Sequence, residues 1–253
     1  MMPDNKICAV IPVFNHGEAI GEVVAAIKRH SLFCILIDDG SDLRCETVLA
    51  TLADQNRRDV HLERLSVNQG KGAAMMAGFR AAFRLGYTHV LQIDADGQHD
   101  ARDIPNFLKL SMEHPTRLIC GQPMFDDSVP KGRLYGRYLT TIWVWINTLS
   151  FSIRDAMCGF RIYPLASTVK LINDVKLGNR MDFDIEVLVR LYWRGIRIIN
   201  QPTHVTYPSD GVSHFKIWRD NVMISRLHTR LFFGMLVRFP LLIWRKIITK
   251  DAV

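Results

Sequence analysis

The sequence predicts an α/β protein in which helices flank a mostly parallel β-sheet. Segments near residues 7–13, 33–37 and 89–93 are apolar almost throughout, as in strands buried on both faces. Segments with apolar residues at helical spacing alternate with them along the chain. A length of 253 residues and a hydrophobic fraction of 48% suit one large domain, or one domain with an appendage, and exclude wholesale disorder.

The other elements follow from apolar spacing and from the turn residues between segments. Ile20, Val23 and Ile27 recur at helical spacing and predict a helix at 18–29. An Ala-rich helix begins after residues 68–72 and runs to residue 85, where Gly86 is a suitable C-cap residue. The remaining pattern predicts helices at 46–53, 138–149 and 183–193, and strands at 61–65 and 196–200.

Polar side chains follow three of the predicted strands. Asn15 follows the first strand, Asp38 and Asp39 end the second, and Asp94 and Asp96 follow the strand at 89–93. Ligands of open α/β sheets bind outside the carboxyl ends of the strands. We therefore expect these side chains to converge on one edge of the sheet.

The Asp94-Ala95-Asp96 segment is the strongest candidate for chemistry. Two carboxylates at positions i and i+2 after a buried strand offer the hard oxygen ligands that Mg²⁺ and Mn²⁺ prefer. An ion shared with a diphosphate would neutralise the charge that develops on a leaving nucleotide. The alternative is a solvated acidic turn, because a bare D-x-D occurs often by chance.

Several motifs together resemble known enzymes. Segments I-P-V-F-N (11–15), I-D-D-G-S (37–41), N-Q-G-K-G (68–72) and D-A-D-G-Q-H (94–99) resemble, in order and spacing, family 2 glycosyltransferases of the GT-A fold, whose sheet is Rossmann-like. Segments D-A-M-C-G-F-R (155–161) and F-D-I-E (183–186) resemble the dolichol-phosphate mannose synthase-like branch. The resemblance covers roughly residues 6–215. It implies a metal-dependent inverting glycosyltransferase that moves a sugar from a nucleotide-sugar donor to a lipid-linked acceptor, such as a polyprenyl phosphate or another lipid.

The resemblance also implies roles for individual residues. The nucleotide base and ribose would contact Pro12, Phe14 and Asp39. The Mg²⁺ or Mn²⁺ ion would be held by Asp94, Asp96 and Gln98. The full donor site implied by the resemblance comprises Pro12, Phe14, Asn15, Asp38, Asp39, Lys71, Asp94, Ala95, Asp96 and Arg133.

Asp155 lies where the resemblance implies a catalytic carboxylate or a contact to the donor sugar. A base is useful only if the acceptor is a hydroxyl group. A phosphate acceptor is already an oxyanion and mainly needs positioning. The alternative role for Asp155 is structural, as a cap on the turn that follows it.

Two departures from the family pattern remove cationic phosphate contacts. The G-S-R segment of the mannose synthases reads G-Q-P at 121–123, and their R-x-x-G-x-S-K begins at Pro208 and ends at His214. Candidates for replacing the lost cations are Arg133, Arg137, His214 and Lys216. The departures favour a second hypothesis, a nucleotide-sugar-binding or membrane-recruiting subunit without catalysis. A nucleotidyltransferase or dehydrogenase would need a Gly-rich loop after the first strand, where the sequence has F-N-H-G (14–17).

The positive charge lies mostly in the C-terminal segment. The chain has a net charge of +7, and residues 212–253 hold eight basic and two acidic side chains, leaving about +1 for residues 1–211. We therefore divide the chain into a GT-A domain at 1–211 and a basic amphipathic tail at 212–253. This distribution favours a local anionic partner and argues against a general nucleic-acid binder.

The tail predicts peripheral attachment to a membrane. Its apolar stretch at 231–244 is shorter than the roughly 20 residues that span a bilayer, and it contains Arg238 and Pro240. We expect a pair of interfacial helices, broken near Pro240, with Trp218 and Trp244 among anionic headgroups at the cytoplasmic face. The alternative is a basic helix hairpin that packs on the core. Five cysteines without a C-x-x-C pair and an N-terminus without a signal-peptide pattern also fit a reduced, cytosolic setting.

Trp143 and Trp145 in the helix at 138–149 either line an acceptor groove or pack in the core or against a membrane. Asp184 and Glu186 lie two residues apart on a predicted helix and face different sides, so we do not expect them to act as one carboxylate pair. These patterns do not select a sugar, a nucleotide base or an oligomeric state.

Overall fold

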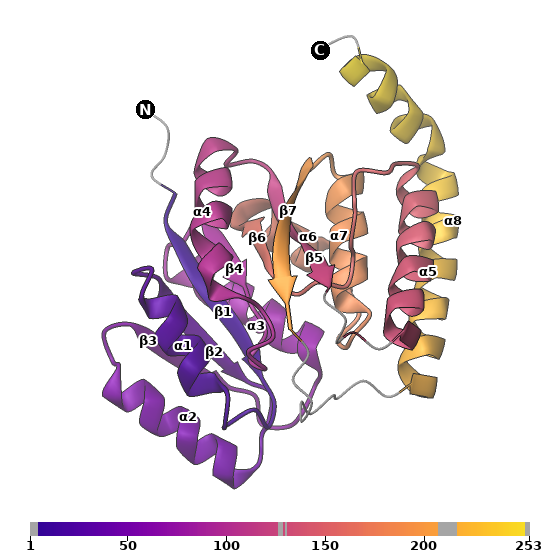
Figure 1. Cartoon of the computed structure of the whole chain (residues 1–253). Helices are drawn as coiled ribbons and strands as arrows, with labels where there is room; N and C mark the ends of the chain where they lie inside the picture. Colours follow the sequence, from indigo (N-terminus) through magenta and orange to yellow (C-terminus); the bar gives the residue numbers. More distant parts are fainter. Residues whose placement is uncertain (1–4, 126–128, 130, 207–216, 251–253) are drawn as a thin grey trace.

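The structure is a computed structural model that describes residues 5–125, 129, 131–206 and 217–250. A seven-stranded sheet with the order β3-β2-β1-β4-β6-β5-β7 forms its centre (Figure 1). Among the described strands only β6 runs against the others, because it pairs antiparallel with both β4 and β5. The strands are β1 (Ile7–Val13), β2 (Phe33–Asp38), β3 (Val60–Arg64), β4 (His89–Gln92), β5 (Leu118–Phe125), β6 (Arg161–Pro164) and β7 (Ile198–Val205). The predicted α/β fold with a mostly parallel sheet is confirmed.

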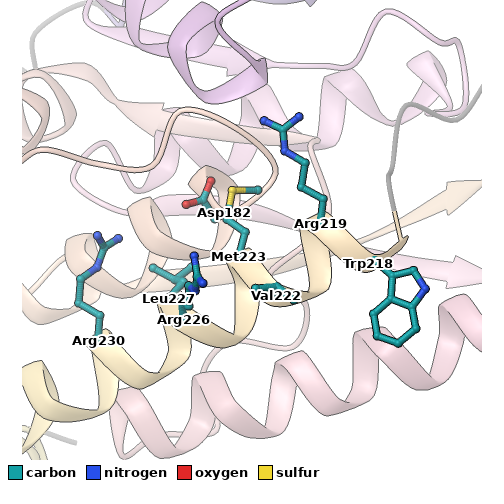
Figure 2. Close-up of a pocket in the computed structure, with 8 residues that line it drawn as sticks. All are labelled: Asp182, Trp218, Arg219, Val222, Met223, Arg226, Leu227 and Arg230. Carbon is teal, nitrogen blue, oxygen red and sulfur yellow. The ribbon is translucent and has the colours of Figure 1, made fainter.

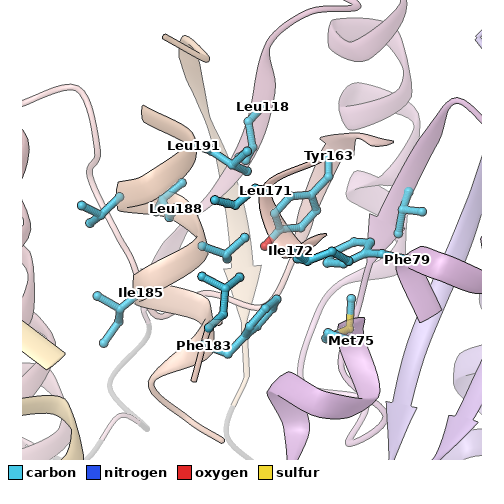
Figure 3. Packing of buried hydrophobic residues seen from close by; sticks show 14 of the residues in the cluster. Met75, Phe79, Leu118, Tyr163, Leu171, Ile172, Phe183, Ile185, Leu188 and Leu191 are labelled. Atoms are coloured by element: carbon cyan, nitrogen blue, oxygen red, sulfur yellow. The ribbon is translucent and has the colours of Figure 1, made fainter. Parts of the chain in front are cut away.

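Helices cover both faces of this sheet (Figure 1). Alternate residues of β1 point to opposite faces, so Val10 packs in one hydrophobic cluster and Ile11 in the other. The cluster of Ile11 includes α1 (Ile20–Lys28), α2 (Leu43–Gln55) and α4 (Ile104–Glu113). The cluster of Val10, part of which Figure 3 shows, includes α3 (Lys71–Arg84), α5 (Lys131–Thr148), α6 (Leu165–Asp174), α7 (Phe183–Trp193) and α8 (Ile217–Lys250). Burial on both faces explains why the strands read as continuous apolar runs.

Most predicted elements lie within a few residues of their expected places. The helix α2 begins earlier than expected, because the Asp42 side chain caps it by accepting a hydrogen bond from the Cys45 N–H. Gly86 lies just beyond the end of α3, as predicted. Its φ is 81°, a left-handed conformation that glycine adopts without strain. The sequence patterns did not predict α4, β5, β6, α6 or the short 3₁₀ turn η1 (Ala101–Asp103).

The C-terminal segment differs from the prediction. The expected break near Pro240 is wrong, because α8 is a single helix with Pro240 inside it. Figure 1 shows the last part of this helix leaning away from the line of its first part, as expected beyond a proline. Its buried residues Ile224, Leu227 and Leu231 belong to the same hydrophobic cluster as α7. A division of the chain at residue 211 stays a prediction.

The helices α5 and α8 lie side by side and form one flank of the molecule (Figure 1). Trp143 of α5 stacks on His228 of α8, with ring centroids 5.9 Å apart. The Trp145 indole donates a hydrogen bond to the Ile153 carbonyl at 2.7 Å. None of the helices in the described part of the chain combines the length and apolarity needed to cross a membrane.

Candidate active site

The polar loops predicted to converge do so at the carboxyl ends of β1, β2 and β4, which lie toward the lower end of the view in Figure 1. The Asn15 N–H donates to the Ser41 hydroxyl at 3.0 Å, and the Asn15 side-chain oxygen accepts from the Asp42 N–H at 2.8 Å. Asn15 adopts a positive φ of 57°, which asparagine tolerates better than most residues. The loops after β1 and β2 are therefore held together by hydrogen bonds.

Asp39 fixes the loop that leads into α3. Its buried carboxylate accepts hydrogen bonds from the Gln69 N–H at 2.7 Å and the Gly70 N–H at 2.8 Å, and from the Asn68 side-chain amide at 3.0 Å. Burial raises the pKa of this carboxyl, although the hydrogen bonds from the loop oppose the shift. Gly70 has a φ of 104°, and a Cβ there would lie 2.5 Å from the Asn179 carbonyl oxygen. The predicted nucleotide residue Asp39 thus shapes the loop as well as lying at the sheet edge.

Asp38 and the apolar donor-site candidates lie at the same edge. The Asp38 carboxylate is buried, accepts from the Ser41 N–H at 2.9 Å and lies 3.5 Å from a guanidinium nitrogen of Arg64. Pro12 and Phe14 are half-buried at the end of β1, and Ala95 is buried. The side chain of Arg133 lies outside the described part of the structure, so its place in the donor site stays a prediction.

Lys71 connects two carboxylates from distant parts of the chain. Its ammonium lies 2.7 Å from an Asp94 oxygen and 3.0 Å from an Asp184 oxygen. Burial opposes the charge of Lys71, but the charges of Asp184 and Asp94 outweigh it and raise its pKa. Burial likewise opposes ionisation of Asp94, but the charge of Lys71 and a hydrogen bond with His99 outweigh it and hold the pKa of Asp94 far below its ordinary value. Lys71 and Asp94 therefore stabilise each other in their charged forms.

This cluster continues into the protein through buried polar groups. Asp184 accepts a hydrogen bond from the Gln92 amide at 3.0 Å, and Gln92 accepts one from the Tyr163 hydroxyl at 3.0 Å. The Arg161 guanidinium then donates to the Tyr163 oxygen at 3.1 Å and to the Asp184 carbonyl at 2.7 Å. The sequence patterns did not predict that these residues are partners. The signal that pointed to them was a glutamine ending an otherwise apolar strand.

The loop after β4 presents the candidate metal ligands. One Asp96 oxygen accepts a hydrogen bond from the Gln98 N–H at 3.0 Å, while Asp94 pairs with Lys71. A Cβ on Gly159 would lie 2.3 Å from an Asp94 oxygen, so only glycine lets the two segments approach so closely. No cluster of three His, Cys, Asp or Glu side chains suited to a metal occurs in the described residues. The two carboxylates fit a divalent ion that takes its remaining oxygen ligands from a diphosphate and water.

Asp155 is engaged on both carboxylate oxygens. Arg137 donates to the two oxygens through its Nε and Nη2 atoms, at 2.9 and 2.8 Å. The N–H groups of Met157 and Cys158 also donate to Asp155, at 2.8 and 2.7 Å. These bonds match the capping alternative that the sequence left open, and they bring Arg137 from α5 to the D-x-x-C-G-F-R segment. Residues 208–214 and 216, which hold the other candidate cations, lie outside the described residues.

Glu186 and Asp184 face different sides of α7, as predicted. Glu186 is buried and pairs with Arg190 and Arg230, each at 2.7 Å, and it accepts from the Gly178 N–H at 2.8 Å. Because Arg230 belongs to α8, Glu186 ties α8 to the body of the protein. It has a structural role and takes no part in the Asp94 cluster.

Comparison with known proteins identifies the family of this chain. Residues 8–173 match the family model described as glycosyl transferase family 2. A polyprenol monophosphomannose synthase of Mycolicibacterium smegmatis is 24% identical, over 83% of this chain and 81% of that protein. An undecaprenyl-phosphate mannosyltransferase of Micrococcus luteus is 24% identical, over 78% of this chain and 82% of its own length.

A solved structure has the same fold. Glucosyl-3-phosphoglycerate synthase from Mycobacterium tuberculosis, in complex with Mn²⁺ and UDP-glucose, superposes with a TM-score of 0.67 at 14% identity. The superposition covers 92% of this chain and 79% of that one. The chain belongs to glycosyl transferase family 2 and is a glycosyltransferase. Its relatives place it in the dolichol-phosphate mannose synthase-like branch of that family, as the sequence motifs predicted.

Proposed function

We propose that this protein is a metal-dependent, inverting glycosyltransferase that moves a sugar from a nucleotide-sugar donor to a lipid-linked phosphate at the cytoplasmic face of a membrane. The observation that carries the proposal is the Asp94-Ala95-Asp96 loop at the carboxyl edge of the sheet, beside the loops of Asn15, Asp39 and Lys71. In a family 2 chain, this edge is the natural place for the donor.

Asp96 and Asp94 are the residues that would hold a Mg²⁺ or Mn²⁺ ion. The related synthase of M. tuberculosis has a structure in complex with Mn²⁺ and UDP-glucose, which supports a divalent ion here. Such an ion neutralises negative charge on the leaving diphosphate when it is bound. Lys71 already balances part of the charge of Asp94, which makes Asp96 the less committed ligand.

The state of Asp155 favours a phosphate acceptor over a hydroxyl acceptor. A general base needs a free oxygen within reach of the proton that it removes. Both oxygens of Asp155 already accept hydrogen bonds, and a phosphate acceptor carries no proton that must be removed. In the proposed step, a phosphate oxygen bonds to the anomeric carbon while the bond from that carbon to the diphosphate breaks. The electron pair of that bond leaves with the nucleoside diphosphate, and attack from the opposite face inverts the anomeric centre.

The flank formed by α5 and α8 supports membrane attachment. Many large apolar side chains are exposed on these two helices. Large exposed apolar patches are rare on soluble monomers and mark interaction surfaces. A surface of this kind suits the interfacial layer of a bilayer, where Trp and Tyr are favoured. The exposed residues are Tyr135, Tyr138, Leu139, Ile142 and Trp143 on α5, and Phe233, Leu236, Val237, Phe239, Leu241, Trp244, Ile247 and Ile248 on α8.

The proposal is tested by release of nucleoside diphosphate from a panel of nucleotide sugars, with Mg²⁺ or Mn²⁺ and a polyprenyl phosphate acceptor. Replacing Asp96→Asn keeps the shape of the side chain and removes its charge, so turnover should fall about 100-fold or more, since a bound metal supplies several kcal/mol. The matched control Asp54→Asn changes an exposed carboxylate on α2 and should leave turnover unchanged. Equal turnover of the Asp96 variant and the wild type would refute the assigned metal site.

The alternative is a nucleotide-sugar-binding or membrane-recruiting subunit without catalysis. The pairing of Asp94 with Lys71 and of Asp155 with Arg137 is the observation that favours it, because both carboxylates are engaged. Tight binding of a nucleotide sugar without transfer to any acceptor in the panel would support this alternative.

A further inference from the structure

A groove runs along the first turns of α8, next to Asp182, the residue before α7 (Figure 2). It has a volume of about 800 Å³. Three arginines, four apolar side chains and one aspartate line it. They are Asp182, Trp218, Arg219, Val222, Met223, Arg226, Leu227 and Arg230.

Most basic side chains of α8 are used to attach the helix to the body. Arg230 pairs with Glu186, the Arg238 guanidinium lies 4.7 Å from the ring centroid of Trp193, and Arg245 donates to the Trp193 carbonyl at 2.6 Å. Lys246 donates to the Leu149 carbonyl. These four cations are therefore occupied by contacts within the protein.

Arg219 and Arg226 differ from those four side chains. Both are exposed, and neither forms an ion pair within the described residues. Asp182 is the acidic residue of the groove, and its carboxylate accepts a hydrogen bond from the Arg180 N–H at 3.2 Å. The groove thus offers two guanidinium groups that no ion pair among the described residues engages, next to apolar side chains. This combination fits an anion that carries a long apolar chain, because guanidinium groups bind phosphate oxygens in pairs of hydrogen bonds.

The wall of the groove connects it to the donor site. Asp182 ends the loop at 178–182, and in this loop the Asn179 carbonyl accepts a hydrogen bond from the Ala73 N–H at 3.0 Å. Ala73 lies in the first turn of α3, two residues after Lys71, whose ammonium touches Asp94. In Figure 1, α8 also begins at the end of the molecule where the carboxyl ends of β1 and β2 lie. The loop at 178–182 therefore contacts both the groove and the first turn of α3, beside the proposed reaction centre.

We propose that this groove is the binding site for the phosphate end of the acceptor lipid. Arg219 and Arg226 hold the phosphate monoester, and Trp218, Val222 and Met223 contact the first carbons of its chain. This inference rests on the proposed function for the identity of the acceptor, but it assigns residues that no sequence motif indicated. It accounts for two exposed arginines of α8 that form no ion pair among the described residues.

Direct binding without a donor tests the groove. Calorimetry on the full chain with farnesyl phosphate, farnesol and inorganic phosphate separates the charged half of the site from its apolar half. We expect the wild type to bind farnesyl phosphate more tightly than either of the other two probes. Arg219→Gln combined with Arg226→Gln should weaken that binding about 10- to 100-fold, since hydrogen bonds to charged groups contribute about tenfold each or more. Both arginines are exposed, and neither forms an ion pair in the part of the chain that the structure describes, so this variant should fold as the wild type does.

The control combines Arg57→Gln with Arg58→Gln, which removes the same charge from an exposed turn after α2 and should not change binding. Trp218→Ala should weaken binding of farnesyl phosphate and leave that of inorganic phosphate unchanged. Unchanged affinity of the Arg219 and Arg226 variant for farnesyl phosphate would overturn the proposal. So would a loss seen only for vesicles of phosphatidylglycerol and phosphatidylcholine, because the groove would then contact membrane headgroups in place of the acceptor.

The two proposals fail in different ways. If the wild type transfers no sugar but binds farnesyl phosphate through Arg219 and Arg226, the proposed function is wrong and the groove stands. If transfer to polyprenyl phosphate occurs but its KM for the acceptor is the same without these arginines, the groove is wrong and the function stands. In the expected case, the acceptor KM rises about tenfold or more while the donor KM is unchanged.

Discussion

The ammonium of Lys71 should be the main electrostatic support of the Asp94 loop. Replacing Lys71→Met keeps the length of the side chain and removes its charge, which leaves Asp94 and Asp184 without the ammonium that contacts both. The side chains are 17% exposed for Lys71, 24% for Asp94 and 6% for Asp184. Removing one partner of a buried pair costs about 3–5 kcal/mol, and partial hydration of Asp94 favours the lower end, about 3 kcal/mol.

The assay is urea or thermal unfolding of the purified full chain at pH 7. A loss of about 3 kcal/mol should lower Tm by roughly 6–12 °C in a protein of this size. The control Arg44→Met breaks the pair between Arg44 and Glu18, whose side chains are 82% and 86% exposed, and should cost less than about 1 kcal/mol. A double variant that adds Asp184→Asn should recover part of the loss, because it removes one of the two uncompensated charges.

The pH dependence gives a second test of the same pair. The pKa of Asp94 lies below its ordinary value in the folded state, so the unfolded state binds more protons as the solution becomes acidic. The stability from this pair is therefore present above the pKa of the unfolded carboxyl, about 3.9, and is lost as pH falls below it. The difference between wild type and Lys71→Met should be constant near neutral pH and shrink in acid. A Lys71 variant as stable as the Arg44 control at pH 7 would refute this reasoning.

Two further predictions concern α8 and the Asp94 loop. Burial lowers the pKa of His228 from 6.5 to about 4. Unfolding should therefore take up a proton between these pH values, and the stability of the wild type should decrease by up to about 3 kcal/mol as the pH is lowered from 6.5 to 4. His228→Leu should flatten that part of a stability-against-pH curve, and an unchanged slope would contradict the assignment. Gly159→Ala should lower sugar transfer about tenfold or more, because its Cβ would lie 2.3 Å from an Asp94 oxygen. Gly21→Ala in α1, where a Cβ meets nothing within 4 Å, is the matched control and should retain full turnover.

The N-terminal half of the fold was predictable because its signals are local. Buried parallel strands need apolar side chains on both faces, and the runs at 7–13 and 33–37 show this directly. The strand β6 was missed because it is short and begins with Arg161, a charged side chain that the sheet buries completely. Its neighbour β5 holds Gly121 and Pro123, which read as turn residues in the sequence alone.

In the C-terminal segment, tertiary packing outweighs the local effect of a proline. Proline inside a helix removes a hydrogen bond and costs about 3 kcal/mol, so a break at Pro240 was the natural expectation. Packing of Leu231, Met235 and Leu242 into the core helps to offset that cost, and α8 continues past the proline. The total charge of the tail could also be counted from the sequence. Which of its cations contact the protein body and which line the groove could not be predicted from it.

The sequence by itself determined the family motifs, the α/β class and the gathering of Asn15, Asp39 and Asp94 at one edge, because strand ends in a parallel sheet share an edge. Tertiary structure alone decided which charges meet. Lys71 finds Asp184 across more than a hundred residues, and Arg137 of α5 closes on both oxygens of Asp155. Electrostatic pairing depends on distance in space and on burial, and neither can be derived from the spacing of residues along the chain.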